Sequence, residues 1–163
     1  IETPKRVVNA YKEFFGGYNS DPEQVLSKTF DEVEGYDEMV IVRDIAIESH
    51  CEHHMVPFIG IAHIGYIPNK RIVGISKLAR IADVFAKRLQ TQETMTAQIA
   101  DTINEVLKPK GVAVVIDAQH QCMTTRGTHK SESSTITSRM LGLFRTNSNT
   151  RNEFMNLINS ANN

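Results

Sequence analysis

Hydrophobic residues recur along the chain with two different periods, which separate expected helices from expected strands. Apolar residues at i, i+3 and i+4 are typical of amphipathic helices. Four segments follow that pattern, and a shorter helix is expected at 21–27; the four are residues 4–15, 77–89, 94–107 and 150–158. Ser76 is the expected N-cap of the helix at 77–89, and Asn149 or Thr150 that of the last helix.

Segments rich in β-branched residues predict four strands. They are residues 39–49, 58–67, 111–125 and 133–144. The polar residues 28–38 predict a loop, and Gln90–Glu93 predict a break between two helices. The order helix, strand, strand, helix, helix, strand, strand, helix is typical of an α+β fold. We expect an antiparallel four-stranded sheet with two helices on one face.

The third expected strand is apolar at successive positions from Val112 to Ile116, and not only at alternate ones. A strand with this pattern is covered on both of its faces. Since the two helices cover one face, we expect neighbouring subunits to cover the other.

Length, composition and net charge favour a globular, single-domain protein over a disordered, nucleic-acid-binding or membrane-spanning one. The 163 residues suit one domain, and 40% hydrophobic with 23% charged residues is a globular balance. A net charge of -1 argues against a general nucleic-acid binder, which is usually basic. No apolar run approaches the roughly 20 residues of a membrane span, and the start lacks a signal-peptide hydrophobic region. We therefore expect a cytoplasmic protein, and we expect further residues upstream of Ile1.

Histidines and both cysteines gather in two short segments. Residues 50–54 are His-Cys-Glu-His-His, in which Cys51 and His54 are three apart, as suits two ligands on one tight turn. His120 and Cys122 are two apart on an expected strand, where both side chains leave the same face. If the turn and the strand meet, thiolates and imidazoles share one pocket, a combination that favours Zn²⁺. Three ligands with an open fourth position are typical of a catalytic zinc site.

Other interpretations of these residues remain open. A single Cys or His in such strands is more often a packing residue, which is what we expect of His63, and Cys51 and Cys122 could form a disulfide. His50–Glu52 matches the His-x-Glu of zinc deaminases, but their Pro-Cys-x-x-Cys is absent. The sequence also lacks His-Glu-x-x-His, the Gly-x-x-x-x-Gly-Lys-Ser/Thr phosphate loop and Gly-x-Ser-x-Gly.

A second group of residues suits an anion. Ser76 and Lys77 stand at an expected helix start, where free N–H groups attract phosphate. Lys77 and Arg80 share one face of that helix. Arg126 and Arg6 are candidates to join them, and a solvated surface is the alternative.

Gln92 and Glu93 form a third candidate group. A carboxylate there could cap the following helix, or it could accept two N–H bonds side by side. Guanine offers such a pair at N1 and its exocyclic amine.

With these segments in place, the sequence resembles the GTP cyclohydrolase I family. The Cys-Glu-His-His and Cys-Met-x-x-Arg-Gly pieces are specific in combination. The matching segments span nearly the whole chain in order: Thr3–Arg6, Cys51–His54, Tyr66–Pro68, Gly74–Arg80, Gln92–Glu93, His120–Gly127 and Asn149–Phe154.

The resemblance implies a fold and an assembly. Family members have the tunnelling fold, in which an antiparallel sheet with two helices joins its copies around a ring into a barrel. They are homodecamers of two pentameric rings, with active sites at subunit interfaces. For this chain it implies one domain over residues 1–163, with an N-terminal helix at 4–15 and a tunnelling-fold core at about 39–160. The charge and the hydropathy favour no nucleic-acid and no membrane partner, and the resemblance does not indicate whether a regulatory protein binds.

The resemblance also implies an activity and its residues. Family members convert GTP and water to 7,8-dihydroneopterin triphosphate and formate, the entry to folate and tetrahydrobiopterin synthesis. The implied zinc ligands are Cys51, His54 and Cys122, and the implied catalytic histidines are His53 and His120. The implied substrate contacts are Arg6, Ser76, Lys77, Arg80 and Arg126 for the triphosphate, and Gln92 and Glu93 for the guanine and its ring.

A mechanism follows from these roles. Zn²⁺ makes water nucleophilic near neutral pH, and the water attacks C8 of the purine. His120 is expected to protonate a ring nitrogen, because an imidazole gives and takes protons near neutrality. His53 is expected to assist further proton transfers. The alternatives are a sister tunnelling-fold enzyme with another pterin or purine-like substrate, and a zinc-stabilised module that holds nucleotides without turnover.

Overall fold

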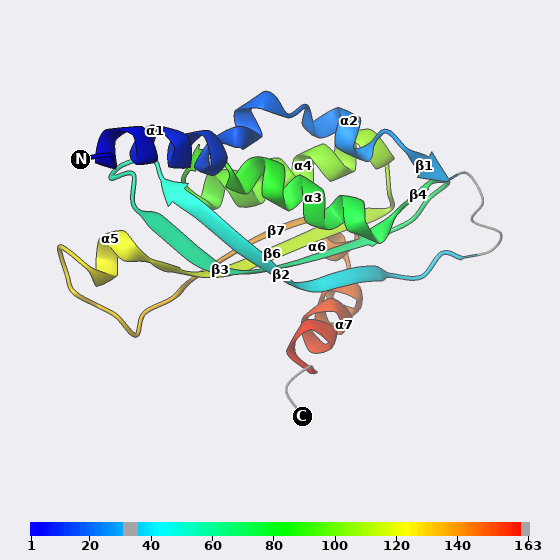
Figure 1. Ribbon diagram of the computed structural model, residues 1–163. Coiled ribbons are helices and arrows are strands. Elements are labelled where there is room, and N and C mark those ends of the chain that lie inside the picture. The colour runs from blue at the N-terminus through cyan, green and yellow to red at the C-terminus, as the bar shows by residue number, and fades with distance from the viewer. Residues whose placement is uncertain (31–35, 161–163) are drawn as a thin grey trace.

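An antiparallel sheet forms the centre of the molecule, and helices lie on both of its faces (Figure 1). The structure is a computed structural model, and it describes residues 1–30 and 36–160. The sheet order is β5-β2-β3-β6-β7, with β2 (Val40–Cys51), β3 (Pro57–Ile67), β6 (Gly111–His120), β7 (Thr135–Gly142) and the short β5 (Leu89–Gln90). The four long strands are antiparallel, and β5 pairs in parallel with β2. The expected α+β fold is thus confirmed, with a short fifth strand added.

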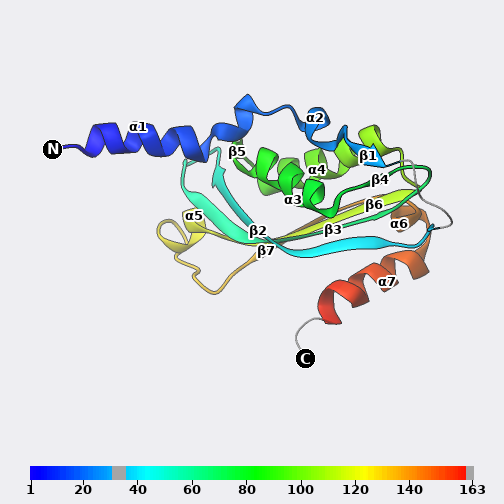
Figure 2. The same cartoon turned by 45° about the vertical axis from the view of Figure 1, so that its right-hand side comes forward.

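Helices and two short strands complete the described part of the chain. The helices are α1 (Thr3–Phe14), the 3-10 helix η1 (Gly16–Asn19), α2 (Pro22–Leu26), α3 (Ile75–Ala86), α4 (Gln92–Leu107), α5 (Gln121–Thr124), α6 (Leu143–Thr146) and α7 (Ser148–Asn159). Strands β1 (Thr29–Phe30) and β4 (Ile72–Val73) pair with each other. Helix α1 buries none of its residues and extends away from the body (Figure 2). None of the helices among these residues combines the length and the apolar character that crossing a membrane requires.

Helices α3 and α4 cover one face of the sheet because each has a continuous apolar side. Their fully buried residues include Leu78, Ile81, Met95, Ile99 and Ile103. These residues share one hydrophobic cluster with sheet residues such as Ile47, Ile64 and Val114. Burying one such side chain stabilises the fold by roughly 1.5–3 kcal/mol. This layer anchors the start of α4 beside the end of β6, where Gln92 contacts Ile116 and His120.

The second face of the sheet is covered in part by the chain's own C-terminal helices. Phe144 of α6 and Phe154 of α7 are fully buried and pack with Val115 of β6. The sequence pattern did not indicate this cover, because the apolar positions of α7 are few. Two isoleucines on the sheet, Ile61 and Ile136, remain 40% and 66% exposed. Cover by neighbouring subunits therefore stays a prediction for that part of the face.

His63 lies in the middle of β3 as a buried residue, in line with its expected packing role. It is 7% exposed, and its Nδ1 accepts a hydrogen bond of 3.2 Å from the backbone N–H of Asp44. Burial lowers the pKa of His63, with a smaller opposing effect of Asp44.

Two expected helix caps are wrong. Helix α3 starts at Ile75 with Gly74 as its N-cap, so Ser76 stands inside the first turn. Helix α7 is capped by Asn147, whose Oδ1 accepts from the backbone N–H groups of Asn149 and Thr150. An N-cap residue needs an extended backbone as well as a suitable side chain, and Asn147 has that backbone.

Three expected boundaries near loops are also wrong. The break at Gln90–Glu93 ends earlier than expected, because the Oγ1 of Thr91 accepts from the N–H of Thr94 and α4 begins at Gln92. The strand expected at 133–144 ends at Gly142, which has a positive φ of 56°, and α6 follows. The loop expected at 28–38 lies partly outside the described residues, and it contains β1.

The strand expected at 111–125 is shorter than expected, with consequences for the site. It ends at His120, and α5 begins at Gln121, where the N–H of Thr125 donates to the Gln121 carbonyl. Cys122 therefore lies on a helical turn, and the expected common strand face of His120 and Cys122 is wrong. The hydroxyl of Thr124 donates to the His120 carbonyl at 3.1 Å and ties this turn to the strand end.

Candidate metal centre and active site

Two thiols and one imidazole meet at one end of the sheet. The ligand atoms of Cys51, His54 and Cys122 all lie within 4.8 Å of one another. Cys51 is the last residue of β2, His54 lies in the turn to β3, and Cys122 lies on α5. Both cysteines are free thiols, so the disulfide considered above is not formed. Sulfur and imidazole donors at this spacing are the set that zinc prefers.

The turn between β2 and β3 places Cys51 and His54 on the same side. The Cys51 N–H donates to the Val56 carbonyl at 2.9 Å, and the Met55 N–H donates to the Cys51 carbonyl at 2.8 Å. Met55 closes the turn with a φ of 55°, in the left-handed region. A tight turn therefore brings two residues three apart in sequence to one point.

Strand pairing delivers the third ligand. Phe58 on β3 is in register with His120 at the end of β6, and α5 follows directly. Cys122, on α5, therefore lies next to Cys51 at the end of β2.

The two cysteines influence each other. Burial raises the pKa of Cys122, and the neighbouring Cys51 raises it further through charge and a hydrogen bond. Two thiolates side by side repel, so a cation between them would reverse this effect. The donor set therefore fits a metal ion in its chemistry as well as its spacing.

The other histidines of the turn border this cluster. The Nδ1 of His53 lies 3.6 Å from the Sγ of Cys51, and its Nε2 lies 4.0 Å from a Glu52 carboxylate oxygen. The Nε2 of His54 lies 3.3 Å from the Nη1 of Arg126, which brings a cation to the rim of the cluster. His53, His54 and Arg126 are all exposed.

His120 is held on two sides. Its ring stacks on Phe58, with centroids 4.6 Å apart and planes 8° from parallel. Its Nε2 lies 2.7 Å from the Oε1 of Gln92, the first residue of α4. Burial lowers the pKa of His120, and the nearby Glu93 acts in the opposite direction. Glu93 itself is exposed, in the first turn of α4.

The remaining expected substrate contacts lie apart from the cluster in one protomer. Ser76, Lys77 and Arg80 occupy the first half of α3, near β4 and opposite to α5 (Figure 1). The C-terminal end of α3 lies beside β5, where the Gln90 amide donates to the Phe85 carbonyl, and Gln90 pairs with Cys51. Arg6 lies on the exposed helix α1, where its guanidinium pairs with Glu2 at 3.3 Å.

The sequence pattern does not predict two neighbours of the site. It predicts Phe58 only as an apolar strand residue, and the contact of Phe58 with His120 depends on the register of β3 and β6. Thr137 of β7 accepts a hydrogen bond of 3.1 Å from Gln92, and nothing in the sequence signals this contact.

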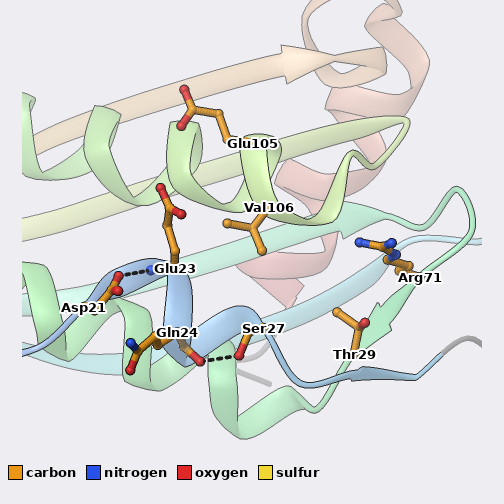
Figure 3. Close-up of a pocket in the computed structure, with 8 residues that line it drawn as sticks. All are labelled: Asp21, Glu23, Gln24, Ser27, Thr29, Arg71, Glu105 and Val106. Atoms are coloured by element: carbon orange, nitrogen blue, oxygen red, sulfur yellow. Dashed lines mark hydrogen bonds between the residues drawn. The ribbon is translucent and has the colours of Figure 1, made fainter.

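A separate pocket of about 480 Å³ lies between α2, the end of α4 and Arg71 (Figure 3). Its acidic lining residues include Glu23 and Glu105. It contains none of the residues singled out from the sequence, and its lining includes Thr29 of β1 and Arg71, which directly precedes β4.

Comparison with known proteins relates the chain to one family. The family model described as GTP cyclohydrolase I matches residues 1–159. The GTP cyclohydrolase 1 of Maricaulis maris (strain MCS10) is 55% identical over 161 residues, which is 99% of this chain and 78% of that protein. That of Hyphomonas neptunium (strain ATCC 15444) is 59% identical over 157 residues, 96% of this chain and 76% of that protein.

A solved structure supports the fold independently of close sequence similarity. The crystal structure of the archaeosine synthase QueF-Like in the apo form superposes with a TM-score of 0.51 at 13% identity. The match covers 64% of this chain and 93% of that one. At this identity the likeness concerns the fold alone.

Proposed function

The chain belongs to the GTP cyclohydrolase I family, and from that premise we propose that the Cys51, His54 and Cys122 cluster is the zinc site of its active centre. The protein converts GTP to 7,8-dihydroneopterin triphosphate and formate, in folate and pterin biosynthesis, and depends on zinc. The observation that supports the location is the meeting of these three side chains beside His120, at the end of the β2–β3 hairpin.

The three residues suit a catalytic rather than a purely structural ion. Structural zinc sites have four protein ligands, whereas catalytic ones have three and leave a position for water or substrate. A zinc ion held here supplies Lewis-acid activation of water near neutral pH, the chemistry that attack on C8 of the purine requires. Cys51, on the β2 end, and Cys122, on α5, hold the ligand set together from two separate elements.

His120 is the proposed general acid for the opening of the purine ring. An aromatic five-membered ring resists attack unless a ring nitrogen is protonated, and an imidazole exchanges protons near neutral pH. Stacking on Phe58 fixes the plane of the His120 ring. His53, next to the Cys51 sulfur, is the proposed partner for further proton transfers.

Glu93 and Arg126 are the proposed substrate contacts nearest to the cluster. An exposed carboxylate at Glu93 can accept the N1–H and exocyclic N–H of guanine side by side. Adenine does not present that pair of donors, so the contact selects GTP. Arg126, at the rim beside His54, can bind a phosphate oxygen.

We further propose that the site is completed by a neighbouring subunit in a homo-oligomer. Ser76 and Lys77 lie roughly 14–15 Å, at 1.5 Å per residue, from Ala86 at the end of α3. One protomer therefore does not bring its own Lys77 to its own zinc cluster. A ring in which α3 of one subunit meets the hairpin of the next resolves this separation. Ten subunits is the number that the family resemblance implies.

Mixed oligomers test the shared site. We expect Lys77→Ala and Cys122→Ser to be nearly inactive alone, and co-expression of the two chains to restore activity. Random assembly leaves about one quarter of shared sites with both intact residues. The measurement is formate release by purified mixed oligomers that carry two different affinity tags. Activity no higher than that of the separate variants would show that each site lies within one chain.

Incubation with GTP, with and without a chelator, tests the function itself. We expect equimolar formate and a pterin that fluoresces after oxidation, both lost on zinc removal and restored by added Zn²⁺. ATP should release no formate, because it lacks the guanine donors. Binding of GTP without any formate would instead support a zinc-stabilised nucleotide-binding module. A cytoplasmic location and the single domain over residues 1–163 remain predictions from the sequence.

A further inference from the structure

Gln92 stands at the start of α4 with its side chain inside the protein. It is 1% exposed, although it is the first residue of a helix and an amide side chain normally faces water. Such a group remains buried only when its hydrogen bonds are satisfied internally. The partners of Gln92 therefore reveal how it is held.

The amide nitrogen of Gln92 faces three groups on the sheet. Its Nε2 lies 3.1 Å from the Ile116 carbonyl, 2.8 Å from the Thr135 carbonyl and 3.1 Å from the Thr137 hydroxyl. A backbone carbonyl can only accept a hydrogen bond, so the group facing it must be the NH₂ and not the oxygen. Ile116 and Thr137 are register partners in β6 and β7, so the sheet itself builds this set of acceptors.

The direction of the Thr137 hydroxyl is also determined. The Thr96 hydroxyl lies 2.6 Å from the Gln92 backbone carbonyl, to which it must donate its one hydrogen. At 2.7 Å from Thr96, the Thr137 hydroxyl must then donate to Thr96 and accept from the Gln92 amide. Rotation of the Gln92 amide by 180° would place its oxygen against these acceptors and break the set.

The orientation of the amide decides the protonation of His120. With the NH₂ turned to the sheet, the Oε1 of Gln92 faces the Nε2 of His120 at 2.7 Å. An amide oxygen only accepts, so Nε2 must carry a hydrogen in both the neutral and the charged imidazole. The neutral ring then has its free lone pair on Nδ1.

We propose that Gln92 is a positioning residue that fixes the ring orientation and the tautomer of His120, with Nε2 bound to Gln92 and Nδ1 left as the nitrogen that can contact the substrate. This inference rests on the role of His120 proposed above. It also assigns the Gln92 side chain a role that differs from a direct guanine contact, because its amide groups are already bound within the chain. The hydrogen bonds of Thr96 and Thr137 contribute to this positioning, because they hold the Gln92 amide in one orientation.

The tautomer can be observed directly in the zinc-loaded wild-type protein. With ¹⁵N-labelled histidine, the chemical shifts of the two ring nitrogens distinguish a protonated from an unprotonated nitrogen. The His120 signals are identified by their absence in His120→Phe. At a pH well above the ordinary histidine pKa, we expect the hydrogen on Nε2. A neutral His120 with its hydrogen on Nδ1 would overturn the proposal.

Kinetics of Gln92→Met give the second readout. Methionine has a similar volume but neither accepts from His120 nor donates to the sheet. We expect kcat to fall about 10- to 100-fold, the range seen when partners that orient metal-ligating histidines are removed, with KM for GTP changed by less than about threefold. A fall in kcat smaller than about tenfold, or a loss confined to KM, would count against the proposal. If the Gln92→Met variant does not fold, the tautomer measured in the wild-type protein is the test of the proposal.

Gln90→Met is the matched control. Gln90 is also buried, at 4% exposure, and its amide donates to the Phe85 carbonyl at 3.0 Å and to Gln98 at 2.9 Å, without contacting His120. We expect Gln90→Met to lower the stability of the protein but to leave kcat near that of the wild type. If Gln90→Met lost as much kcat as Gln92→Met, the role of Gln92 would be structural only. The proposed role of His120 is tested separately. If the His120→Phe variant kept its activity, that role would be wrong, whereas the tautomer of His120 could still be measured in the wild-type protein.

Discussion

Replacement of Cys122 by serine should release zinc and stop formate production from GTP. A serine hydroxyl is not a ligand that zinc retains at neutral pH in place of a thiolate, and only Cys51 and His54 would remain. Loss of an outer-shell partner alone costs about 10- to 100-fold in metal affinity, so loss of a direct ligand should cost more. Zinc per protomer by elemental analysis and formate release are measured on the same sample.

A histidine outside the cluster provides the control for this variant. His129 lies in the loop after α5 with a φ of 52°, so His129→Asn removes an imidazole at a position where asparagine tolerates the backbone. We expect this variant to keep both zinc and activity. Stoichiometric zinc in Cys122→Ser would show that the ligand set is wrong, whatever the rate.

Replacement of His120 by phenylalanine should remove proton transfer while leaving the metal in place. Phenylalanine keeps the aromatic stack on Phe58 but has no ring nitrogen. General acid–base catalysis contributes about 10²- to 10⁴-fold, and we expect kcat to fall within that range. The zinc content should match that of the wild type, which separates this variant from Cys122→Ser.

The His120→Phe variant also leaves the buried Gln92 amide without its histidine partner. Gln92 loses its partner at Oε1, and an unpaired buried acceptor costs roughly 1–3 kcal/mol of stability. Denaturation of His120→Phe should therefore be measured alongside kcat, at a temperature where the variant is fully folded. A folded, zinc-loaded variant whose kcat lies within tenfold of the wild type would contradict the role of His120.

The main elements of the fold were predictable because they depend on local periodicity. Each long helix and strand appeared within a few residues of its expected place, since an apolar stripe has to face a core wherever that core lies. The errors fall at element ends, where a short-range hydrogen bond decides between neighbours. Among these errors, the early end of β6 at His120 affects the metal site, because it places Cys122 on a helical turn instead of a strand.

The sequence alone determined the chemistry available to this protein: two thiols, a group of imidazoles and separate cationic and carboxylate positions, in an order that resembles one family. Only the tertiary structure decided which of these groups meet. The pairing of β3 with β6 brings Cys122 to Cys51, and the sheet acceptors turn the Gln92 amide toward His120. Both results depend on contacts between residues far apart in the chain, whose register and hydrogen-bond directions no local pattern of residues encodes.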